Sequence, residues 1–547
     1  ALQAVRDGET VILPDEWRKT YDHFLGSIQD WCVSRQLWWG HQIPAWHNRD
    51  TGEVVVARER PARCAGEAWT QDADVLDTWF SSALWPFSTL GWPEQTAALA
   101  KFYGAPSSDL ETGYDILFFW VARMMMMGLH FMGKVPFRTV YLTSTVTDET
   151  GAKMSKMKGN TIDPLDVVHG ATLDAMLERA TRDNVPDEAV RNLKKLFAKG
   201  ISPMGADALR FALAALNTSG RYIRLSIDRV EGYRNFINKL WNASRFALMN
   251  LDGYDPERFA AQQNLFELPE RWIMSRLAAT VGAVDAALEA FRFADAANAL
   301  YHFVWHELCD WYIELAKPNL YHADVLDQDQ ERNALRHRTQ GVLASTLETT
   351  MRLMHPFTPY VSEEIWQKLP KPTQLPASLM ITVFPKATER DAEAESEMET
   401  IQEVVRNCRM MKQTYGISPA QTVKVAINAT THQALLERYK AFVERMARVD
   451  ASFGPWQHGS ARVVISSGLE VSMPIEGLVD PTVEKGRISK DLAKAEKEVG
   501  GLEKKLGNAD FVARAPEDVV AEQRERLVEE QARCQRLRDA IATLEAL

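Results

Sequence analysis

The stretch that decides how this chain is organised is Lys153-Met-Ser-Lys-Met-Lys-Gly-Asn160. Its lysines crowd into a few residues, and it ends in a glycine followed by an asparagine. The preceding residues 140–147 are rich in β-branched and aromatic side chains and predict a strand, and residues 148–151 are turn formers. The sequence therefore predicts a strand, a tight turn and a basic loop, whose ammonium groups can stabilise charge as it moves along a phosphate chain.

A solvated surface loop is the simpler explanation of three closely spaced lysines, and for a generic basic run it is the better one. The loop is also not a Walker A phosphate-binding loop, because the spacing GxxxxGK[ST] does not occur in it. Physical reasoning about the charges leaves both interpretations open.

The same residues resemble the KMSKS signature of the class I aminoacyl-tRNA synthetases, with Met157 in place of the last serine. The resemblance implies that this loop binds ATP and stabilises the transition state of adenylate formation. It also implies that Lys153 and Lys156 contact phosphates, Lys156 being the more critical of the two. Met157 removes a hydroxyl group and leaves both charges in place.

The length of 547 residues predicts three or four domains with cores of their own. The net charge of −11 argues against indiscriminate nucleic-acid binding but allows a local basic face. Five scattered cysteines predict reduced thiols and a cytoplasmic setting, and no signal-peptide pattern opens the chain. The apolar stretch 116–132 contains Arg123 and His130 and is short for a membrane span, so we expect a buried helix and no membrane partner.

Four tryptophans lie within the segment 31–46, together with Arg35. They could form an aromatic wall that stacks on a base, or they could simply fill a core. The segment resembles the part of valyl-tRNA synthetases that follows their inserted editing domain, which makes Arg35 a candidate tRNA contact. His41 and His47 have only Cys64 nearby, so we expect no zinc site.

The segment 74–87 contains Asp77 and Trp79, which are the residue types that a valine site needs. An apolar wall fits a branched side chain, and a carboxylate pairs with the α-ammonium group. Packing at the end of a strand would explain the same residues. The resemblance to valyl enzymes favours Trp79 in the amino-acid pocket and makes Asp77 a second candidate.

Residues 111–124 contain Gly113, Asp115 and Ile116. A glycine lets a ligand approach the backbone, and an aspartate at a helix start either accepts from ribose hydroxyls or caps the helix. In the resembled family this element contacts the adenosine, which implies ATP binding by Gly113 and Asp115 and a place for Ile116 in the valine pocket.

The helical segment 231–246 has an apolar face and a polar face that carries Arg234 and Asn238. An ordinary amphipathic surface explains the pattern, and the resemblance adds tRNA contact as an expectation. His302, His306 and Cys309 follow helical spacing among bulky apolar residues, and we expect core histidines there, not metal ligands.

Apolar residues in the segment 488–506 alternate in steps of four and three, and those of 520–541 recur every seven. They predict an antiparallel helical hairpin with lysines and glutamates on its flanks. Such a hairpin could serve dimerisation, but it resembles the coiled-coil tRNA-binding arm of bacterial valyl-tRNA synthetases. Between residues 386 and 480 an acidic helix and short strands predict a small α/β module.

The predicted architecture is multidomain. It combines the C-terminal half of a class I Rossmann-like α/β catalytic domain (1–205), a helical anticodon-binding bundle (206–385), the small α/β module (386–480) and the coiled-coil arm (481–547). The resemblance implies valine, ATP with Mg²⁺, and tRNA(Val) as partners of a monomeric enzyme that forms valyl-adenylate and transfers valine to tRNA.

The family's HIGH segment and editing domain are not found in the chain, so we expect a missing N-terminal catalytic half as a partner and an inactive isolated chain. Three alternatives remain: an isoleucyl or leucyl enzyme of the same class, a non-catalytic tRNA-binding paralogue, and a helical scaffold protein.

Overall fold

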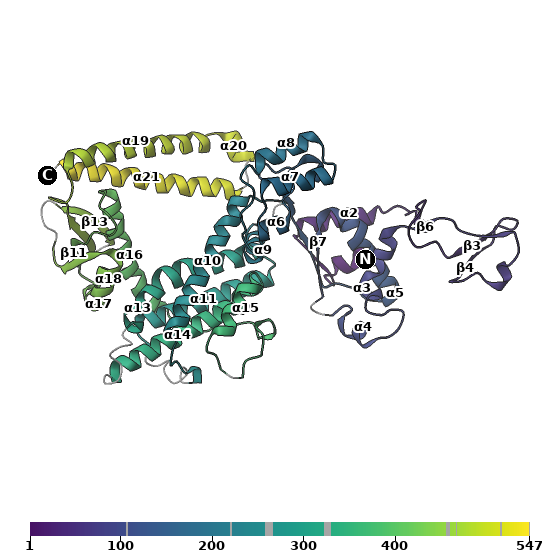
Figure 1. Ribbon diagram of the computed structural model, residues 1–547, viewed down its shortest axis with the longest axis horizontal. Helices are drawn as coiled ribbons and strands as arrows, with labels where there is room; N and C mark the ends of the chain where they lie inside the picture. Colours follow the sequence, from purple (N-terminus) through teal and green to yellow (C-terminus); the bar gives the residue numbers. More distant parts are fainter. Residues whose placement is uncertain are drawn as a thin grey trace. The chain divides into compact units, whose positions relative to one another are not determined.

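The computed structural model describes residues 1–105, 108–218, 221–257, 266–321, 330–372, 374–455, 460–466, 468–514 and 517–545 (Figure 1). The described residues form two compact units. The first consists of Ala1–Ile237, Val284–Ala299 and Phe357–Tyr360, and the second of Asn238–Ala283, Leu300–Pro356 and Val361–Leu547.

A parallel sheet lies at the centre of the first unit, with strand order β1-β8-β7 (β1 Val11–Leu13, β8 Thr139–Thr143, β7 Asp109–Gly113). Val140 and Leu142 of β8 are buried, as expected for a strand between two neighbours. They pack with Tyr21 of α2 (Glu16–Gly26) and with residues of α5 (Ala122–Met132) in one core. The short α1 (Leu2–Arg6) adds Ala4 and Val5 to this core.

The apolar stretch that predicted one buried helix is built from three helical types. A 3-10 turn (η2, Tyr114–Ile116) leads into a π-helical turn (η3, Leu117–Val121) and then into α5. Among the described residues, the helix Tyr114–Met132 is long and apolar enough to cross a membrane by length and composition alone, and a third of its apolar window is buried. Leu117, Val121 and Met125 are among the residues that anchor one face of it in the core.

The strand predicted over residues 140–147 is two strands in two sheets. β8 ends at Thr143, opposite Gly113 at the end of β7, and β9 (Thr145–Thr147) then pairs in parallel with β10 (Tyr222–Arg224). The chain changes sheets here because its first partner strand has ended, which composition does not reveal.

The lysine loop (Lys153–Asn160) contains a 3-10 turn, η4 (Lys156–Lys158). Four helices follow it in the first unit: α6 (Pro164–His169), α7 (Leu173–Arg182), α8 (Asp187–Leu196) and α9 (Ala206–Ala215). Val167, Met176 and Phe197 pack with Ala208 and Val230 in a second core. Capping side chains start α6 and α7, where Asp163 and Thr172 accept backbone N–H groups.

The segment 34–102 carries short antiparallel pairings and two helices. Its elements are β2 (Ser34–Arg35), β3 (Ala45–Asn48), β4 (Val54–Val56), η1 (Ala62–Cys64), β5 (Trp69–Gln71), β6 (Val75–Leu76), α3 (Thr78–Ser88) and α4 (Ala97–Phe102). β2 pairs with β6, and β3 lies between β4 and β5. Trp38 and Trp39 follow β2 and are 99% and 88% exposed, so they fill no core in the described chain.

Long and short helical elements follow: α10 (Ile227–Asn250), α11 (Leu268–Glu289), α12 (Phe293–His302), the π-helical η6 (Phe303–Tyr312), α13 (Ile313–Leu320), α14 (Gln330–Met354), α15 (Pro359–Lys368) and the 3-10 turn η8 (Leu379–Ile381). Pro359 opens α15, where its missing N–H is not needed. α14 and α15 are therefore separate helices.

The expectation of core histidines in this region is wrong. The His302 and His306 side chains are 63% and 51% exposed, and they lie 3.3 Å from Glu307 and 3.5 Å from Asp310. Both residues sit at or in η6, whose i→i+5 hydrogen bonds change the turn that α-helical spacing assumes. Burial raises the pKa of the neighbouring Cys309 thiol to about 12.

A four-stranded sheet of order β12-β11-β14-β13 follows α16 (Ala392–Thr414). Its elements are β11 (Val423–Ala429), α17 (Gln433–Arg438), α18 (Lys440–Ala447), β12 (Val449–Phe453), β13 (Ser460–Ser466) and β14 (Leu469–Pro474). The buried Lys412 ammonium group of α16 lies within hydrogen-bond distance of four backbone carbonyl oxygens, those of Pro419, Gln421, Ala447 and Arg448, which share its three N–H groups, and so fixes the helix to the loops around the sheet.

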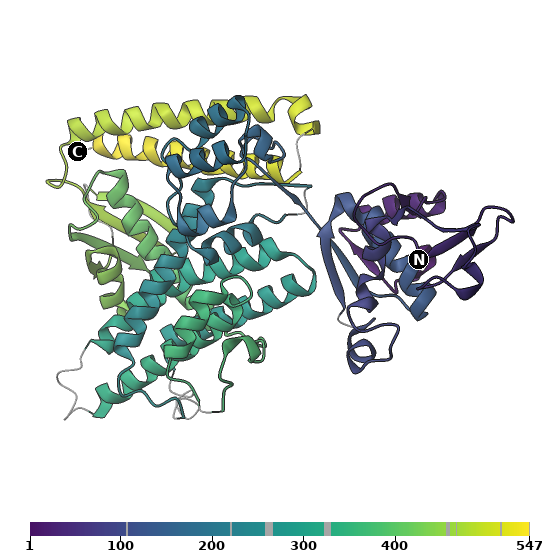
Figure 2. The same cartoon turned by 45° about the vertical axis from the view of Figure 1, so that its right-hand side comes forward.

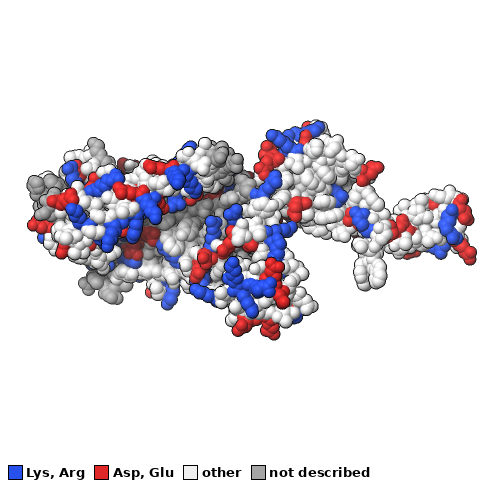
Figure 3. All heavy atoms as spheres, turned by 90° about the horizontal axis from the view of Figure 1, so that it is seen from above, with Lys and Arg blue, Asp and Glu red and all other residues white. Residues whose placement is uncertain are grey.

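The chain ends in an antiparallel pair of helices, α19 (Pro481–Leu506) and α21 (Glu517–Glu545), joined through α20 (Ala509–Arg514). Figures 1 and 2 show the two long helices side by side. Ile488, Ala495 and Leu502 are buried between them, at the steps of seven that the sequence contains. Lysines and arginines alternate with acidic residues on the outer surface of this helix pair, at the left of the view in Figure 3.

Candidate functional site

A network of hydrogen bonds from Asp148 forms the base of the lysine loop. Its Oδ1 accepts from the backbone N–H groups of Thr150 (3.0 Å) and Ala152 (2.9 Å) and from the Thr150 hydroxyl (2.7 Å). Gly151 completes the turn with a φ of +85°, where other residues are strained. The turn predicted from composition is therefore held by one carboxylate, in an Asx-type arrangement.

Asn160 closes the other end of the loop. Its Nδ2 donates to Asp148 Oδ2 (2.7 Å) and to the Lys153 carbonyl (3.4 Å), and its Oδ1 accepts from the Ser155 N–H (2.9 Å). The side chain is buried, so these partners replace water. One asparagine thus fixes both the start and the middle of the loop.

The hydrogen bonds keep Asp148 ionised. Its partial removal from water acts to raise the pKa, but hydrogen bonds from Thr150, Asn160 and Ala152 outweigh this and lower the pKa to about 2. The loop therefore carries a fixed negative charge at its base at any physiological pH.

The loop points its charges outward. Lys153, Lys156 and Lys158 are exposed, whereas Gly159 and Asn160 are buried. The Lys156 ammonium nitrogen lies 3.7 Å from a carboxylate oxygen of Asp183. Exposed ammonium groups on a loop fixed from below can meet an incoming polyanion without first ordering the backbone.

The Gly113–Asp115 element lies where β7 ends, at the carboxyl ends of the parallel strands. A Cβ on Gly113 would stand 2.7 Å from Asp115 Oδ1, so glycine is what allows the aspartate to fold back over the strand end. Asp115 is exposed and available to a ligand. Ligands of open parallel sheets bind at this end of the strands.

Tyr222 of β10 connects this element to the lysine loop. The phenol groups of Tyr222 and Tyr114 share a hydrogen bond, which raises the Tyr222 pKa, and the charge of Lys153 is close enough to act against that rise. The structure therefore brings Lys153 and the Gly113–Asp115 element to one place, although about forty residues separate them in the sequence.

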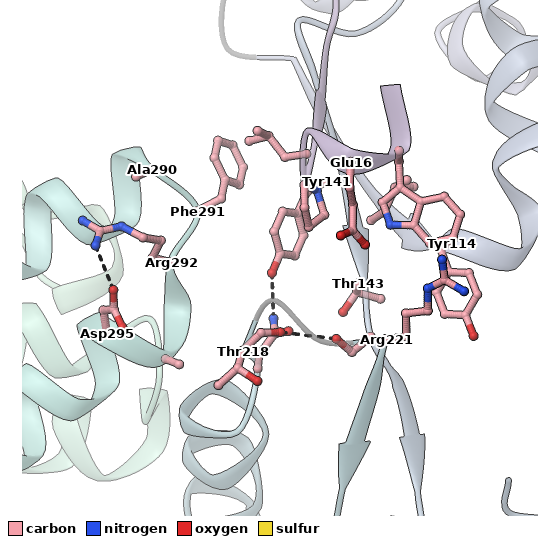
Figure 4. A pocket seen from close by; sticks show the side chains of 17 residues that line it. Glu16, Tyr114, Tyr141, Thr143, Thr218, Arg221, Ala290, Phe291, Arg292 and Asp295 are labelled. Atoms are coloured by element: carbon pink, nitrogen blue, oxygen red, sulfur yellow. Dashed lines mark hydrogen bonds and ion pairs between the residues drawn. The ribbon is translucent and has the colours of Figure 1, made fainter. Parts of the chain in front are cut away.

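A cavity of about 220 Å³ opens at the carboxyl ends of β1 and β8 (Figure 4). One wall is aromatic: Trp17 stacks on Tyr114 with ring centroids 5.0 Å apart, and the Arg221 guanidinium lies 5.1 Å from the Trp17 ring. Figure 4 shows Arg221 alongside Tyr114 and the Tyr141 hydroxyl directed toward the residues around Thr218. Aromatic faces beside a cation suit a planar, anionic ligand.

The opposite wall carries an acceptor that its neighbours do not use. Asn217 Nδ2 donates to the Tyr141 hydroxyl over 3.1 Å, while Asn217 Oδ1 is buried without a hydrogen-bond partner among the described residues. Phe291 stacks on Tyr141 with centroids 5.7 Å apart. A donor group on a ring bound in this cavity would satisfy the free oxygen.

The residues predicted for an amino-acid site lie around the start of α3. Trp79 stacks on Phe119, three residues after Ile116, with centroids 5.8 Å apart. Asp77 is buried and caps α3 by accepting the Trp79 N–H (3.2 Å), and it also accepts from Arg35 (2.6 Å) and from Trp31 Nε1 (3.0 Å). The carboxylate already has three donors, which gives it a structural role here.

Two of the three predicted tRNA contacts, Arg35 and Arg234, have partners within the chain. Arg35 lies in β2 and pairs with Asp77, and its other nitrogen donates to the carbonyls of Cys32 and Ser34. Arg234 pairs with Glu231 at 2.7 Å on α10. Asn238 is exposed one turn further along the same helix. All three remain predictions.

Sequence reasoning missed Trp17, Arg221 and Tyr222. It placed Asp148 in a turn without identifying its hydrogen bonds, and it did not assign Asn160 a role. The last two carried a signal, since an aspartate before a glycine turn and an asparagine after Gly159 are hydrogen-bonding turn residues. The other three carried none, because their neighbours are distant in sequence. Among the described residues no group of three or more histidine, cysteine, aspartate or glutamate side chains could hold a metal ion.

Three family models match the chain. Residues 1–226 match the class I tRNA synthetases of isoleucine, leucine, methionine and valine, residues 270–427 match the anticodon-binding domain of tRNA ligases, and residues 480–545 match the tRNA-binding arm of valyl-tRNA synthetases. The valine–tRNA ligase of Syntrophotalea carbinolica is 43% identical to this chain, and the match covers 100% of the chain. The chain belongs to the valyl-tRNA synthetase family.

Further valine–tRNA ligases match the chain to a similar extent. The valine–tRNA ligases of Geobacter sulfurreducens and Francisella tularensis are 44% and 42% identical and cover 97% of the chain. The chain spans 57% of the Syntrophotalea enzyme and 56% of the Geobacter enzyme. Among solved structures, a Mycobacterium tuberculosis methionyl-tRNA synthetase with methionyl-adenylate matches at a TM-score of 0.47 and 17% identity, over 70% of this chain and 66% of that one.

Proposed function

We propose that this chain is the C-terminal portion of a valine–tRNA ligase, which activates valine with ATP to valyl-adenylate and transfers it to tRNA(Val). The observation that carries the proposal is the lysine loop. Its ammonium groups are exposed, its backbone is fixed by Asp148 and Asn160, and Lys153 lies near the Gly113–Asp115 element. Phosphoryl-site catalysis consists largely of such positioned charge.

In this proposal Lys153 and Lys156 contact the phosphates of ATP, and Gly113 and Asp115 contact its adenosine. The two lysines then follow the negative charge as pyrophosphate departs. Mg²⁺ arrives with ATP and is held mainly by phosphates and water.

Valine binding is assigned to Trp79 and Ile116. The Trp79 ring packs on the segment that follows Ile116, which supports an apolar wall for a branched side chain. Asp77 supports this wall from behind through Arg35 and Trp31, and direct contact with the amino group remains a further prediction for it. An apolar pocket of this kind rejects threonine only weakly, a limit that is already established for valyl enzymes.

The tRNA partner is assigned to Arg35, to Arg234 and Asn238 of α10, and to the C-terminal hairpin, within the four-part division 1–205, 206–385, 386–480 and 481–547. The similarity of residues 270–427 and 480–545 to an anticodon-binding domain and a tRNA-binding arm supports a tRNA partner and the part of the hairpin in binding it, while Arg35, Arg234 and Asn238 lie outside these ranges. An isoleucyl or leucyl activity is not favoured, because the arm and the similar enzymes are of the valine type. All five cysteines are free, which suits the cytoplasm.

Valine-dependent ATP–pyrophosphate exchange tests the proposal. The chain is supplied with the part of a valine–tRNA ligase that lies outside the matched region, and Lys156→Ala is compared with the reference chain. Loss of one transition-state interaction should slow exchange about a hundredfold, or about 3 kcal/mol.

Lys158→Ala is the matched control, because Lys158 is also exposed on the same loop and has no phosphate role in the proposal. It should change the rate less than about threefold. Equal rates for Lys156→Ala and the control would remove Lys156 from the mechanism. Exchange that depends on isoleucine instead of valine would overturn the assignment of the amino acid.

A further inference from the structure

A pair of helices packs against the lysine loop, and neither the sequence patterns nor the proposed reaction accounts for it. α7 and α8 follow the loop in the chain and fold back so that α8 contacts the 3-10 turn Lys156–Lys158. The contact involves the backbone of both partners, which makes it stiffer than a contact between long side chains.

Gly159 forms the closest part of this contact. Its φ is +66°, and a Cβ built on it would stand 2.0 Å from the carbonyl oxygen of Ala189 and 2.6 Å from the carbonyl carbon. Ala189 is buried and belongs to the first turn of α8, so its backbone cannot move without moving the helix. Glycine is required at position 159 both by conformation and by the approach of α8.

Two polar contacts extend the interface to either side. Asn192 Nδ2 of α8 donates to the Lys158 carbonyl oxygen over 3.2 Å, and the Asp183 carboxylate at the end of α7 lies 3.7 Å from the Lys156 ammonium group. α7 is itself tied to α6, because Arg179 pairs with the buried Asp166.

The loop is also anchored from inside. Met154 packs against the core that contains Val167 of α6 and Met176 of α7, and Leu193 of α8 packs against the same core. The loop therefore alternates between residues held by the helices and lysines left in solvent. Any movement of α8 must be transmitted to the position of the lysines.

We propose that the α7–α8 hairpin (Leu173–Leu196) is the positioning element of the lysine loop, with the Gly159–Ala189 contact as its fixed point. Asp183 holds the Lys156 ammonium group until a more highly charged anion displaces it. The proposal rests on the assignment of Lys156 to the phosphates of ATP, but its structural part is testable without that assignment.

The difference in charge between Asp183 and a triphosphate explains why the Lys156 ammonium group would exchange one for the other. The Lys156 and Asp183 side chains are 76% and 38% exposed, so their ion pair is weak and screened. A triphosphate carries several charges where Asp183 carries one, and it wins the competition at modest concentration. Because the ion pair with Asp183 is weak, it orients the Lys156 ammonium group but does not prevent its release to the triphosphate.

Hydrogen exchange followed by mass spectrometry tests the fixed point in the intact chain. In Gly159→Ala the new methyl group forces the loop and α8 apart, so amides of the loop (155–160) and of α8 (190–193) should both exchange about tenfold faster. Gly151→Ala is the matched control: its φ of +85° carries the same strain, but the nearest atom is a mobile Arg224 side-chain nitrogen 3.3 Å away.

The control should loosen the turn and leave α8 unchanged. Faster exchange of the loop in Gly159→Ala with no change in α8 would overturn the proposal, because the two would then not be coupled. The same effect on α8 in both variants would also overturn it, since backbone strain alone would explain the result.

Binding of inorganic tripolyphosphate to the chain tests the role of Asp183. Asp183→Asn should bind it about two- to fivefold more tightly, as expected for loss of a weak competing ion pair. Asp174→Asn, an exposed aspartate at the other end of α7, should show less than half of that gain. Equal gains in affinity in both variants would show that Asp183 acts only by general repulsion of the anion, and this would overturn its assignment as the partner of Lys156.

The two experiments separate this proposal from the proposed function. Failure of the reference chain to bind tripolyphosphate would contradict the phosphate role of the lysines and the role of Asp183 together. Coupled exchange of loop and α8 in Gly159→Ala would still establish the hairpin as the positioning element.

Discussion

Replacement of Asn160 by alanine should release the lysine loop from its base. The Asn160 side chain is 7% exposed and makes three hydrogen bonds, to Asp148, to the Ser155 N–H and to the Lys153 carbonyl. Alanine removes all three and leaves the Ser155 N–H without its partner. The fold of the surrounding helices does not depend on these bonds, so the effect should be local.

The magnitude follows from the kinds of bond. The bond to the Asp148 carboxylate is charge-assisted and counts for about 1.5–3 kcal/mol, and the bond from the Ser155 N–H counts for about 1 kcal/mol. The 3.4 Å contact with the Lys153 carbonyl is long and adds little. The free energy of local opening should therefore fall by about 3 kcal/mol, or roughly a hundredfold in the opening equilibrium.

Native-state hydrogen exchange of the Ser155 amide measures this opening directly, because its hydrogen bond is one of those removed. Asn192→Ala is the control: Asn192 is an exposed amide with a single 3.2 Å bond to the same loop, and its loss should cost less than about 1 kcal/mol. A change at Ser155 no larger in Asn160→Ala than in the control would refute the reasoning, because water would then replace the buried amide at no cost.

Three further expectations concern the amino-acid site, the arm and acid stability. Trp79→Ala should enlarge the valine pocket, raising the valine KM and relaxing discrimination against isoleucine in pyrophosphate exchange, and unchanged values of both would place the pocket elsewhere. Deletion of residues 481–545 should weaken tRNA binding and lower the slope of log affinity against log salt by about one for each phosphate group that the arm no longer binds, while an equal loss of valine activation would mean that the arm stabilises the fold. The hydrogen bond from Arg390 lowers the pKa of Glu395 to about 2, despite partial burial and with help from Ser275 and Arg276, so its ion pairs stabilise the folded chain above about pH 4.5 and this contribution is lost as the pH falls toward 2. In Glu395→Gln that contribution, about 2 kcal/mol after solvent screening, should disappear from an acid titration followed by circular dichroism, and an unchanged titration would contradict the assignment.

Local patterns in the sequence determined the elements whose partners lie next to them in the chain. The steps of three, four and seven in 488–541 correspond to α19 and α21, whose buried positions Ile488 and Ala495 are those the period selects. The turn at 148–151 and the exposed lysines also followed from composition, because turn chemistry and charge act within a few residues. The family followed from the same local motifs.

The sequence fell short where an element's surroundings come from far away in the chain. β8 and β9 were predicted as one strand, because the change of partner from β7 to β10 depends on where those strands end. The sequence predicted short strands between residues 386 and 480, but not the pairing of β11 with β12 and β14 that builds the small sheet. His302 and His306 lie at the end of α12 and in η6, where a π-helical turn replaces the expected α-helical stripe, and both side chains are exposed.

The site shows the same division. The residue types of the lysine loop and of the Gly113–Asp115 element were recognisable in the sequence, because each is a short motif with its own chemistry. Their meeting through Tyr222, and the approach of Ala189 to Gly159, exist only in the folded chain. Periodicity predicts which side of an element faces a core. It does not predict which distant segment of the chain packs against that side, because that depends on the packing of the whole unit.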